Sequence, residues 1–175
     1  LPPAPHDAPV ELRWEVARDE HFSDIVRRGT VEARADEAHS VHVEPRGLAP
    51  DRWYWYRFVA GGEASPVGRT RTAPAPGTLP AKLRFAFAAC QQYEHGYYAA
   101  HRDIAERGPD LAAFLGDYIY EASWGRDRVR SHGAPTATTL AEYRARYALY
   151  KSDEDLQAAH AAAPWIVTWD DHEVV

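Results

Sequence analysis

Three short polar clusters each follow an apolar segment of this chain, and each contains side chains that can bind a metal ion or transfer a proton. They are Cys90 and His95 in the first cluster, Asp117, Tyr120 and Glu121 in the second, and Asp170, Asp171 and His172 in the third. Carboxylates suit hard cations such as Ca²⁺, Mg²⁺ or Mn²⁺, whereas a phenolate and a thiolate together favour a trivalent ion such as Fe³⁺. A two-metal centre can hold both the attacking and the leaving oxygen of a phosphoryl displacement, and a histidine beside it can donate a proton. The residue types therefore predict metal-assisted hydrolysis.

The three clusters would meet if the apolar segments before them are neighbouring parallel strands. These segments are residues 83–88, 110–115 and 165–169. Between them the sequence predicts a helix at 97–107 and two further helices that begin near Thr139 and Ser152. Alternating strands and helices are typical of an α/β domain with a parallel sheet, in which ligands bind beyond the carboxyl ends of the strands. We therefore expect one crevice that collects all three clusters.

The first part of the chain is predicted to be all-β. Apolar residues at 12, 14 and 16 alternate with charged ones, and further strands are expected at 25–33, 40–44, 52–59 and 67–72, separated by turn residues. Short strands of this kind suggest a β-sandwich. The segment 48–58 resembles the fibronectin type III pattern, which implies that the Tyr54 hydroxyl bonds back to the preceding loop. For Trp53 and Trp55 two readings stay open: a sugar- or partner-binding strip, or a surface that a neighbouring domain covers.

Composition narrows the class of protein. The 175 residues are 45% hydrophobic with a net charge of −6, which suits packed cores and argues against a nucleic-acid or anionic-membrane surface. No apolar stretch of about 18 residues is present, so no transmembrane segment is expected. The single cysteine excludes an intrachain disulfide. The chain opens on a proline-rich segment without a signal peptide and closes on a polar cluster, so we expect a fragment.

Longer strings of residues carry a family resemblance. Gly116-Asp117-x-x-Tyr120 resembles a box of the purple-acid-phosphatase-like metallophosphoesterases, and residues 170–173 occupy the place of their Gly-Asn-His-Glu box. The strings at 66–72, 87–91, 115–121, 143–147 and 165–174 resemble the PhoD family of alkaline phosphatases and phosphodiesterases. This resemblance implies a fibronectin-III-like β-sandwich at 1–73 that lacks its first strand, a proline-rich linker at 74–81, and the N-terminal half of an α/β metallophosphoesterase domain at 82–175.

The resemblance also implies roles for individual residues. Cys90 and Tyr120 would bind iron, Asp117 would bridge two metals, Asp171 would bind the second metal and His172 would be catalytic. Asp170, His95 and Glu121 are expected in the pocket or just behind the ligands. The implied cofactors are Fe³⁺ and Ca²⁺, with other divalent ions as substitutes.

The implied protein is a secreted, periplasmic or cell-surface monomer that hydrolyses small phosphate mono- and diesters. The family's later ligands are absent from these residues, so we expect little or no turnover from this chain alone. The rival hypothesis is a non-catalytic, fibronectin-like binding or structural module with a degenerate α/β domain, and a Cys/His nucleophile is a third. The presence together of Cys90, Asp117, Tyr120, Asp171 and His172 favours an enzymatic origin.

Several side chains are expected to be structural. Tyr143, Tyr147 and Tyr150 recur at helical spacing and are expected in the core. His101 is expected to face solvent. Arg144 and Arg146 are candidate phosphate contacts by charge, but solvated pairs with Glu142 or Asp155 are favoured for them. Glu94 is expected behind the ligands or on the surface.

Overall fold

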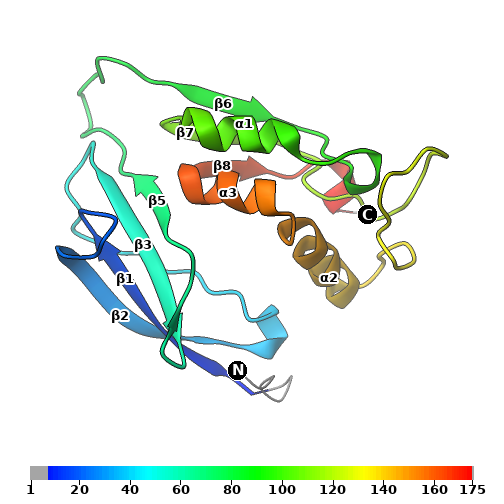
Figure 1. Cartoon of the computed structure of the whole chain (residues 1–175), viewed down its shortest axis with the longest axis horizontal. Coiled ribbons are helices and arrows are strands. Elements are labelled where there is room, and N and C mark those ends of the chain that lie inside the picture. Colours follow the sequence, from blue (N-terminus) through cyan, green and yellow to red (C-terminus); the bar gives the residue numbers. More distant parts are fainter. Residues whose placement is uncertain (1–7, 175) are drawn as a thin grey trace. The chain divides into compact units, whose positions relative to one another are not determined.

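The computed structural model describes residues 8–174. The chain divides between Pro80 and Ala81 into two compact units, and Figure 1 labels most of their helices and strands. Among the described residues, no helix is long and apolar enough to cross a membrane.

The first unit is built on one antiparallel sheet. Its strands are β1 (Val10–Ala17), β2 (Ile25–Ala33), β3 (Trp53–Ala60), β4 (Glu63–Ala64) and β5 (Gly68–Arg71). The order is β2-β1-β3-β4, and β5 also pairs with β3. The strands predicted at 25–33 and 52–59 are confirmed almost to the residue. The two-layered, fibronectin-like arrangement is not confirmed, because the strands described between residues 8 and 80 all belong to this one sheet.

The predicted tyrosine hydrogen bond is present in this unit. The Tyr54 side chain is 2% exposed, and its hydroxyl accepts the N–H of Ala49 at 2.9 Å. Next to it on β3, the ring of Trp53 lies under the guanidinium of Arg69, 4.2 Å from the ring centroid. One face of Trp53 is therefore already covered by a cation.

The strand predicted at residues 40–44 is wrong. This segment belongs to no strand, although its residues alternate as a strand would. Ala38 and His39 just before it adopt left-handed backbone angles, with φ of 53° and 55°. Just after this segment, the backbone carbonyls of Arg46 and Gly47 accept hydrogen bonds from the Arg27 side chain at 2.7 Å each, instead of pairing with a strand.

The second unit contains the predicted parallel sheet. Strands β6 (Phe85–Ala88), β7 (Leu111–Leu115) and β8 (Trp165–Thr168) pair in parallel in that order. All three end immediately before the polar clusters, so the expectation that these clusters share one edge of a sheet is confirmed. Only the central strand, β7, has fully buried side chains, at Ala112 and Phe114.

Helices connect these strands. They are α1 (Ala99–Arg107), α2 (Leu140–Lys151) and α3 (Glu154–Ala162), and two short 3₁₀ turns, η2 (Tyr93–His95) and η3 (Asp171–Glu173), follow β6 and β8. The predicted capping box is present at Thr139 and Glu142. The cap of α3 is Asp153, one residue after the predicted start, and its carboxylate accepts two backbone N–H groups.

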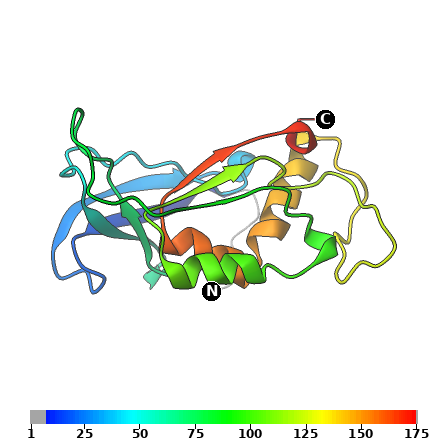
Figure 2. The ribbon, with the colours of Figure 1, turned by 90° about the horizontal axis from the view of Figure 1, so that it is seen from above.

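The core lies between the sheet and the helices. Figure 2 shows α1 and α3 on one side of the three strands. Phe114, Tyr150 and Leu156 are at most 1% exposed there, with Tyr143 and Tyr147 packed against them, so the core placement of the α2 tyrosines is confirmed. The other face of the sheet is apolar but open. It carries Phe85, Phe87, Leu115 and Ile166, whose exposed fractions lie between 54% and 68%.

Candidate metal centre

The ends of β6 and β7 stay paired beyond the strands themselves. The N–H of Cys90 donates to the carbonyl of Gly116 at 3.1 Å, and the N–H of Gln91 donates to the carbonyl of Asp117 at 3.1 Å. This continued parallel pairing brings Cys90 beside Asp117, although 27 residues separate them along the chain.

The backbone turns sharply after both strands. Cys90 and Asp117 have φ of 57° and 54°, and Gly116 has φ of 107°. Non-glycine residues in the left-handed region cost roughly 1–2 kcal/mol, so the surrounding contacts must hold them there. Gly116 has a further constraint: a Cβ at this position would lie 2.6 Å from the Cβ of Asp170. Glycine therefore allows the loops after β7 and β8 to touch.

Asp117 lies at the centre of the candidate site. Its Oδ2 accepts the Tyr120 hydroxyl at 3.0 Å and lies 3.4 Å from the Cys90 sulfur. Donor atoms of Asp117, Asp171 and His172 all lie within 4.8 Å of one another. The fold thus brings the three other predicted ligands and His172 around the carboxylate of Asp117.

The same carboxylate has an unsatisfied oxygen. Asp117 is 7% exposed, and its Oδ1 is buried without a hydrogen-bond partner among the described residues. A buried acceptor without a partner costs about 1–3 kcal/mol, which a bound cation would remove. The donor set therefore fits a metal ion.

Without a metal, the protein surroundings favour the protonated forms of the Cys90 thiol and the Tyr120 phenol. Desolvation, followed by the hydrogen bond to Asp117, raises the pKa of the Cys90 thiol. Desolvation and the same carboxylate raise the pKa of the Tyr120 hydroxyl strongly. Thiolate and phenolate ligands therefore need the positive charge of a metal in place of these protons.

His172 is fixed on three sides. Its Nδ1 lies 2.7 Å from Oε2 of Glu121. Its ring stacks on Trp124 with centroids 5.1 Å apart and also contacts the ring of Tyr120 at 4.3 Å. Burial on its own would lower the pKa of His172, but the hydrogen bond to Glu121 and nearby carboxylate charges outweigh it and raise the pKa. With Nδ1 engaged, Nε2 is the nitrogen left for chemistry.

Asp170, His95 and Glu121, which were expected in the pocket or just behind the ligands, all bond to segments at the edge of the cluster. The Asp170 side chain accepts the N–H of Asp171 at 3.0 Å and so caps η3. The Nε2 of His95 lies 3.0 Å from the carbonyl of Trp124, so this ring braces the loop behind the cluster. Glu121 and Asp170 each contact one of the five candidate residues directly, Glu121 through the ring of His172 and Asp170 through the backbone N–H of Asp171.

Glu173 was not singled out from the sequence, yet it makes the most backbone contacts at the site. Its carboxylate accepts the N–H groups of Asp117, Ile119 and Asp170 at 3.2, 3.1 and 2.7 Å. The contact with Asp170 could have been predicted from the sequence, because an acidic N-cap residue followed three residues later by Glu is a capping box. No sequence pattern near Glu173 predicts its hydrogen bonds to the N–H groups of residues 117 and 119.

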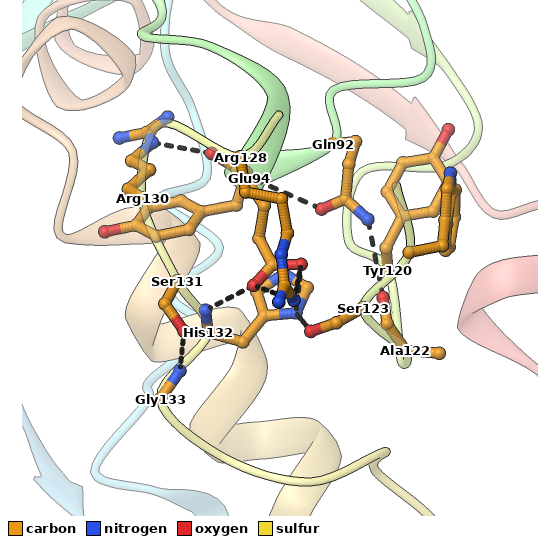
Figure 3. A network of polar contacts seen from close by, with 12 residues as sticks. Gln92, Glu94, Tyr120, Ala122, Ser123, Arg128, Arg130, Ser131, His132 and Gly133 are labelled. Atoms are coloured by element: carbon orange, nitrogen blue, oxygen red, sulfur yellow. Dashed lines mark hydrogen bonds and ion pairs between the residues drawn. The ribbon is translucent and has the colours of Figure 1, made fainter. Parts of the chain in front are cut away.

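The loop at 121–138 carries Glu121 and Trp124, and a buried carboxylate anchors it. Figure 3 shows Glu94 among Ser123, Arg128 and His132 of this loop. The Glu94 side chain is completely buried; it accepts the His132 N–H at 3.0 Å and pairs with Arg128 at 3.3 Å. Burial would raise the pKa of Glu94, but these hydrogen bonds and charges hold it below its ordinary value. The surface alternative for Glu94 is therefore wrong.

Two other predicted solvent positions are also wrong. His101 is 4% exposed and lies 2.7 Å from the side-chain oxygen of Gln91, so it supports the segment after Cys90. Arg146 is 3% exposed and donates to the backbone carbonyls of Tyr120 and Pro135. Both side chains position the loops of the site.

Comparisons with known proteins identify the family of this chain. Residues 85–175 match the family model of the PhoD-like phosphatases, and residues 1–74 match the model of the PhoD-like phosphatase N-terminal domain. The chain is 55% identical over 170 residues to alkaline phosphatase D of Bacillus subtilis (strain 168), covering 94% of this chain and 29% of that protein. The solved structure of PhoD superposes with a TM-score of 0.91 at 54% identity, covering 96% of this chain and 33% of the other. The chain thus spans about a third of the length of these relatives, and it belongs to the PhoD-like phosphatase family.

Proposed function

We propose that this chain supplies the first part of the metal site of an alkaline phosphatase that hydrolyses phosphate mono- and diesters. One observation carries the proposal most directly. Asp117 is a buried carboxylate with one oxygen unsatisfied and the other bonded to a phenol, with a thiol 3.4 Å away. The unsatisfied oxygen is a cost for a purely structural carboxylate, whereas a metal ion bound there would remove that cost.

The proposed ligands divide into two groups. Cys90 and Tyr120 would hold Fe³⁺, Asp117 would be shared, and Asp171 would hold Ca²⁺ or another divalent ion. When bound, such ions neutralise charge on the phosphoryl oxygens and make water a better nucleophile near neutral pH. The metal identities rest on the donor types and on the family resemblance.

The chain's own contribution to the reaction centres on His172. Glu121 holds its Nδ1 and favours the protonated ring, while Tyr120 and Trp124 fix the plane of the imidazole. We infer that Nε2 donates a hydrogen bond to the phosphoryl group or a proton to the leaving oxygen. Fixing the ring in advance avoids the cost of orienting it in the transition state.

The finer organisation is proposed along the same lines. Residues 1–73 would belong to a fibronectin-like sandwich, 74–81 to a linker, and 82–175 to the N-terminal half of a metallophosphoesterase domain. The natural protein would act outside the cytoplasm, as a monomer, on small phosphate esters. Because these 175 residues span only about a third of the relatives' length, turnover belongs to the intact natural polypeptide.

A metal-loading experiment tests the proposal. In the intact polypeptide loaded with Fe³⁺ and Ca²⁺, we expect a visible phenolate-to-iron charge-transfer band that is lost in Tyr120→Phe, while any band from the Cys90 thiolate remains. Tyr118→Phe is the matched control, because the Tyr118 hydroxyl bonds to His160 and not to the site. A visible spectrum that is unchanged in Tyr120→Phe would sink the assignment of Tyr120 as a ligand.

The role of His172 has a separate test. His172→Ala should lower the turnover of phosphate esters and leave the metal content unchanged. Loss of metal in this variant would make His172 a ligand, in keeping with its place within 4.8 Å of Asp117 and Asp171.

A further inference from the structure

We propose that Glu173 is a positioning residue that fixes the spacing between the two loops that carry the metal site. This inference rests on the proposed function, because it assigns Glu173 to the metal-binding geometry. The two loops are the 117–120 loop after β7 and the 170–173 turn after β8. Glu173 is itself outside the group of side chains whose donor atoms converge.

The contacts of Glu173 tie one loop to the other. Its Oε2 accepts the N–H of Asp170 at 2.7 Å and the N–H of Asp117 at 3.2 Å. Its Oε1 accepts the N–H of Ile119 at 3.1 Å. One carboxylate therefore binds two peptide groups of the 117–120 loop and one of its own turn. The first of these peptide groups belongs to Asp117, the residue at the centre of the site.

Only a carboxylate of this length satisfies all three donors. An ionised carboxylate accepts at both oxygens, whereas glutamine would place an NH₂ group against a backbone N–H. Aspartate is shorter by one methylene and cannot reach the same groups without moving the turn. Ile119 is fully buried, so its N–H has no ready replacement from water.

The strained backbone of Asp117 makes the contact matter for the metal. Asp117 has φ of 54°, and the hydrogen bond to Glu173 acts on the N–H of that same residue. Asp171 and His172 lie between Asp170 and Glu173 in the 170–173 turn. Glu173 therefore sets how far Asp171 and His172 lie from Asp117. Groups that orient metal ligands in this way are worth about 10- to 100-fold in metal affinity.

The test uses Glu173→Gln in the intact natural polypeptide, with Glu142→Gln as the matched control. Glu142 forms the same kind of capping box at the start of α2, accepting the N–H groups of Thr138 and Thr139 at 2.9 Å each, and it lies outside the site. Mn²⁺ alone is titrated into each protein by electron paramagnetic resonance. Amide hydrogen exchange is followed in the metal-free proteins at residues 117 and 119.

We expect Glu173→Gln to weaken Mn²⁺ binding by about 10- to 100-fold and to speed exchange of both amides. Glu142→Gln should change neither. Faster exchange with unchanged Mn²⁺ affinity would show a purely structural role and overturn the proposal.

The wild-type protein provides a measurement that does not depend on the variant folding. Its Asp117 and Ile119 amides should exchange slowly although they lie outside the helices and strands, and fast exchange there would refute the contact with Glu173. If the wild-type protein does not bind Mn²⁺ while both amides are protected, the metal site of the proposed function fails and the link between the two loops stands.

Discussion

Replacing Tyr150 by phenylalanine removes one oxygen atom from the core of the second unit and should have a large effect. Tyr150 is fully buried, and its hydroxyl joins three segments. It accepts the backbone N–H groups of Tyr93 and Tyr120 at 3.2 Å each and donates to the side chain of Gln92 at 3.0 Å. Phenylalanine fills the same space, so the change leaves two backbone N–H groups and the Nε2 of His132, which lies 3.0 Å from the hydroxyl, without this partner. The side-chain oxygen of Gln92 still accepts the N–H of Glu94.

The size of the effect follows from those unpaired groups. A buried polar group without a partner costs about 1–3 kcal/mol. The two N–H bonds are at the long end of the normal range, which favours the lower end of that cost. We therefore expect Tyr150→Phe to lower the free energy of unfolding of this unit by about 2–4 kcal/mol.

Tyr143 on the same helix is the matched control. Its hydroxyl is buried, and among residues 8–174 it has no hydrogen-bond partner. Tyr143→Phe should therefore change stability by less than about 0.5 kcal/mol, or raise it, because an unsatisfied hydroxyl is removed. The slowest-exchanging amides of the second unit report its opening free energy without interference from the first unit. Equal losses in the two variants would refute the reasoning.

Two further variants test other contacts. Burial, followed by the charges of Lys151 and His101, lowers the pKa of His160 from its usual 6.5 to about 4. On acidification the unfolded chain therefore takes up a proton at this residue before the folded protein does. The free energy of unfolding should fall as the pH drops from about 6.5 towards 4. His160→Gln keeps an acceptor for the Tyr118 hydroxyl but cannot titrate, so urea unfolding across this window should show a shallower pH dependence, and an unchanged slope would contradict the assignment. Tyr54→Phe leaves the Ala49 N–H unpaired and should destabilise the first unit by about 1–2 kcal/mol in thermal unfolding, whereas an unchanged midpoint would mean that solvent replaces the bond.

The strands and helices that the sequence predicts correctly are those whose signals lie in neighbouring residues. The three strands of the parallel sheet are short apolar runs, and the helices carry caps such as Thr139, so their positions follow from neighbouring residues. The meeting of Cys90 with Asp117 follows from one rule about parallel strand ends. The residues 40–44 show the limit of this reasoning, because a strand pattern needs a partner strand, and two left-handed residues precede this segment.

The parts that were missed depend on long-range contacts. Nothing near Glu94 in the sequence indicates that it is buried, because its partners at 128 and 132 lie more than thirty residues away. The same holds for Glu173, whose bonds to the 117–120 loop span 54 and 56 residues. Charged residues are usually assigned to the surface, and a buried one is found only when its partners are known.

The open face of the parallel sheet has a consequence for biosynthesis. Each strand is added on the same side of the previous one, and right-handed crossovers then place both connections on the same face, as Figure 2 shows for α1 and α3. The opposite face keeps Phe85, Phe87 and Ile166 in solvent. A nascent chain that has been synthesised as far as β8 therefore exposes an apolar surface that favours association with other apolar surfaces. We expect chaperones that hold unfolded proteins to capture it at that stage, and refolding yields of the isolated chain to fall with concentration.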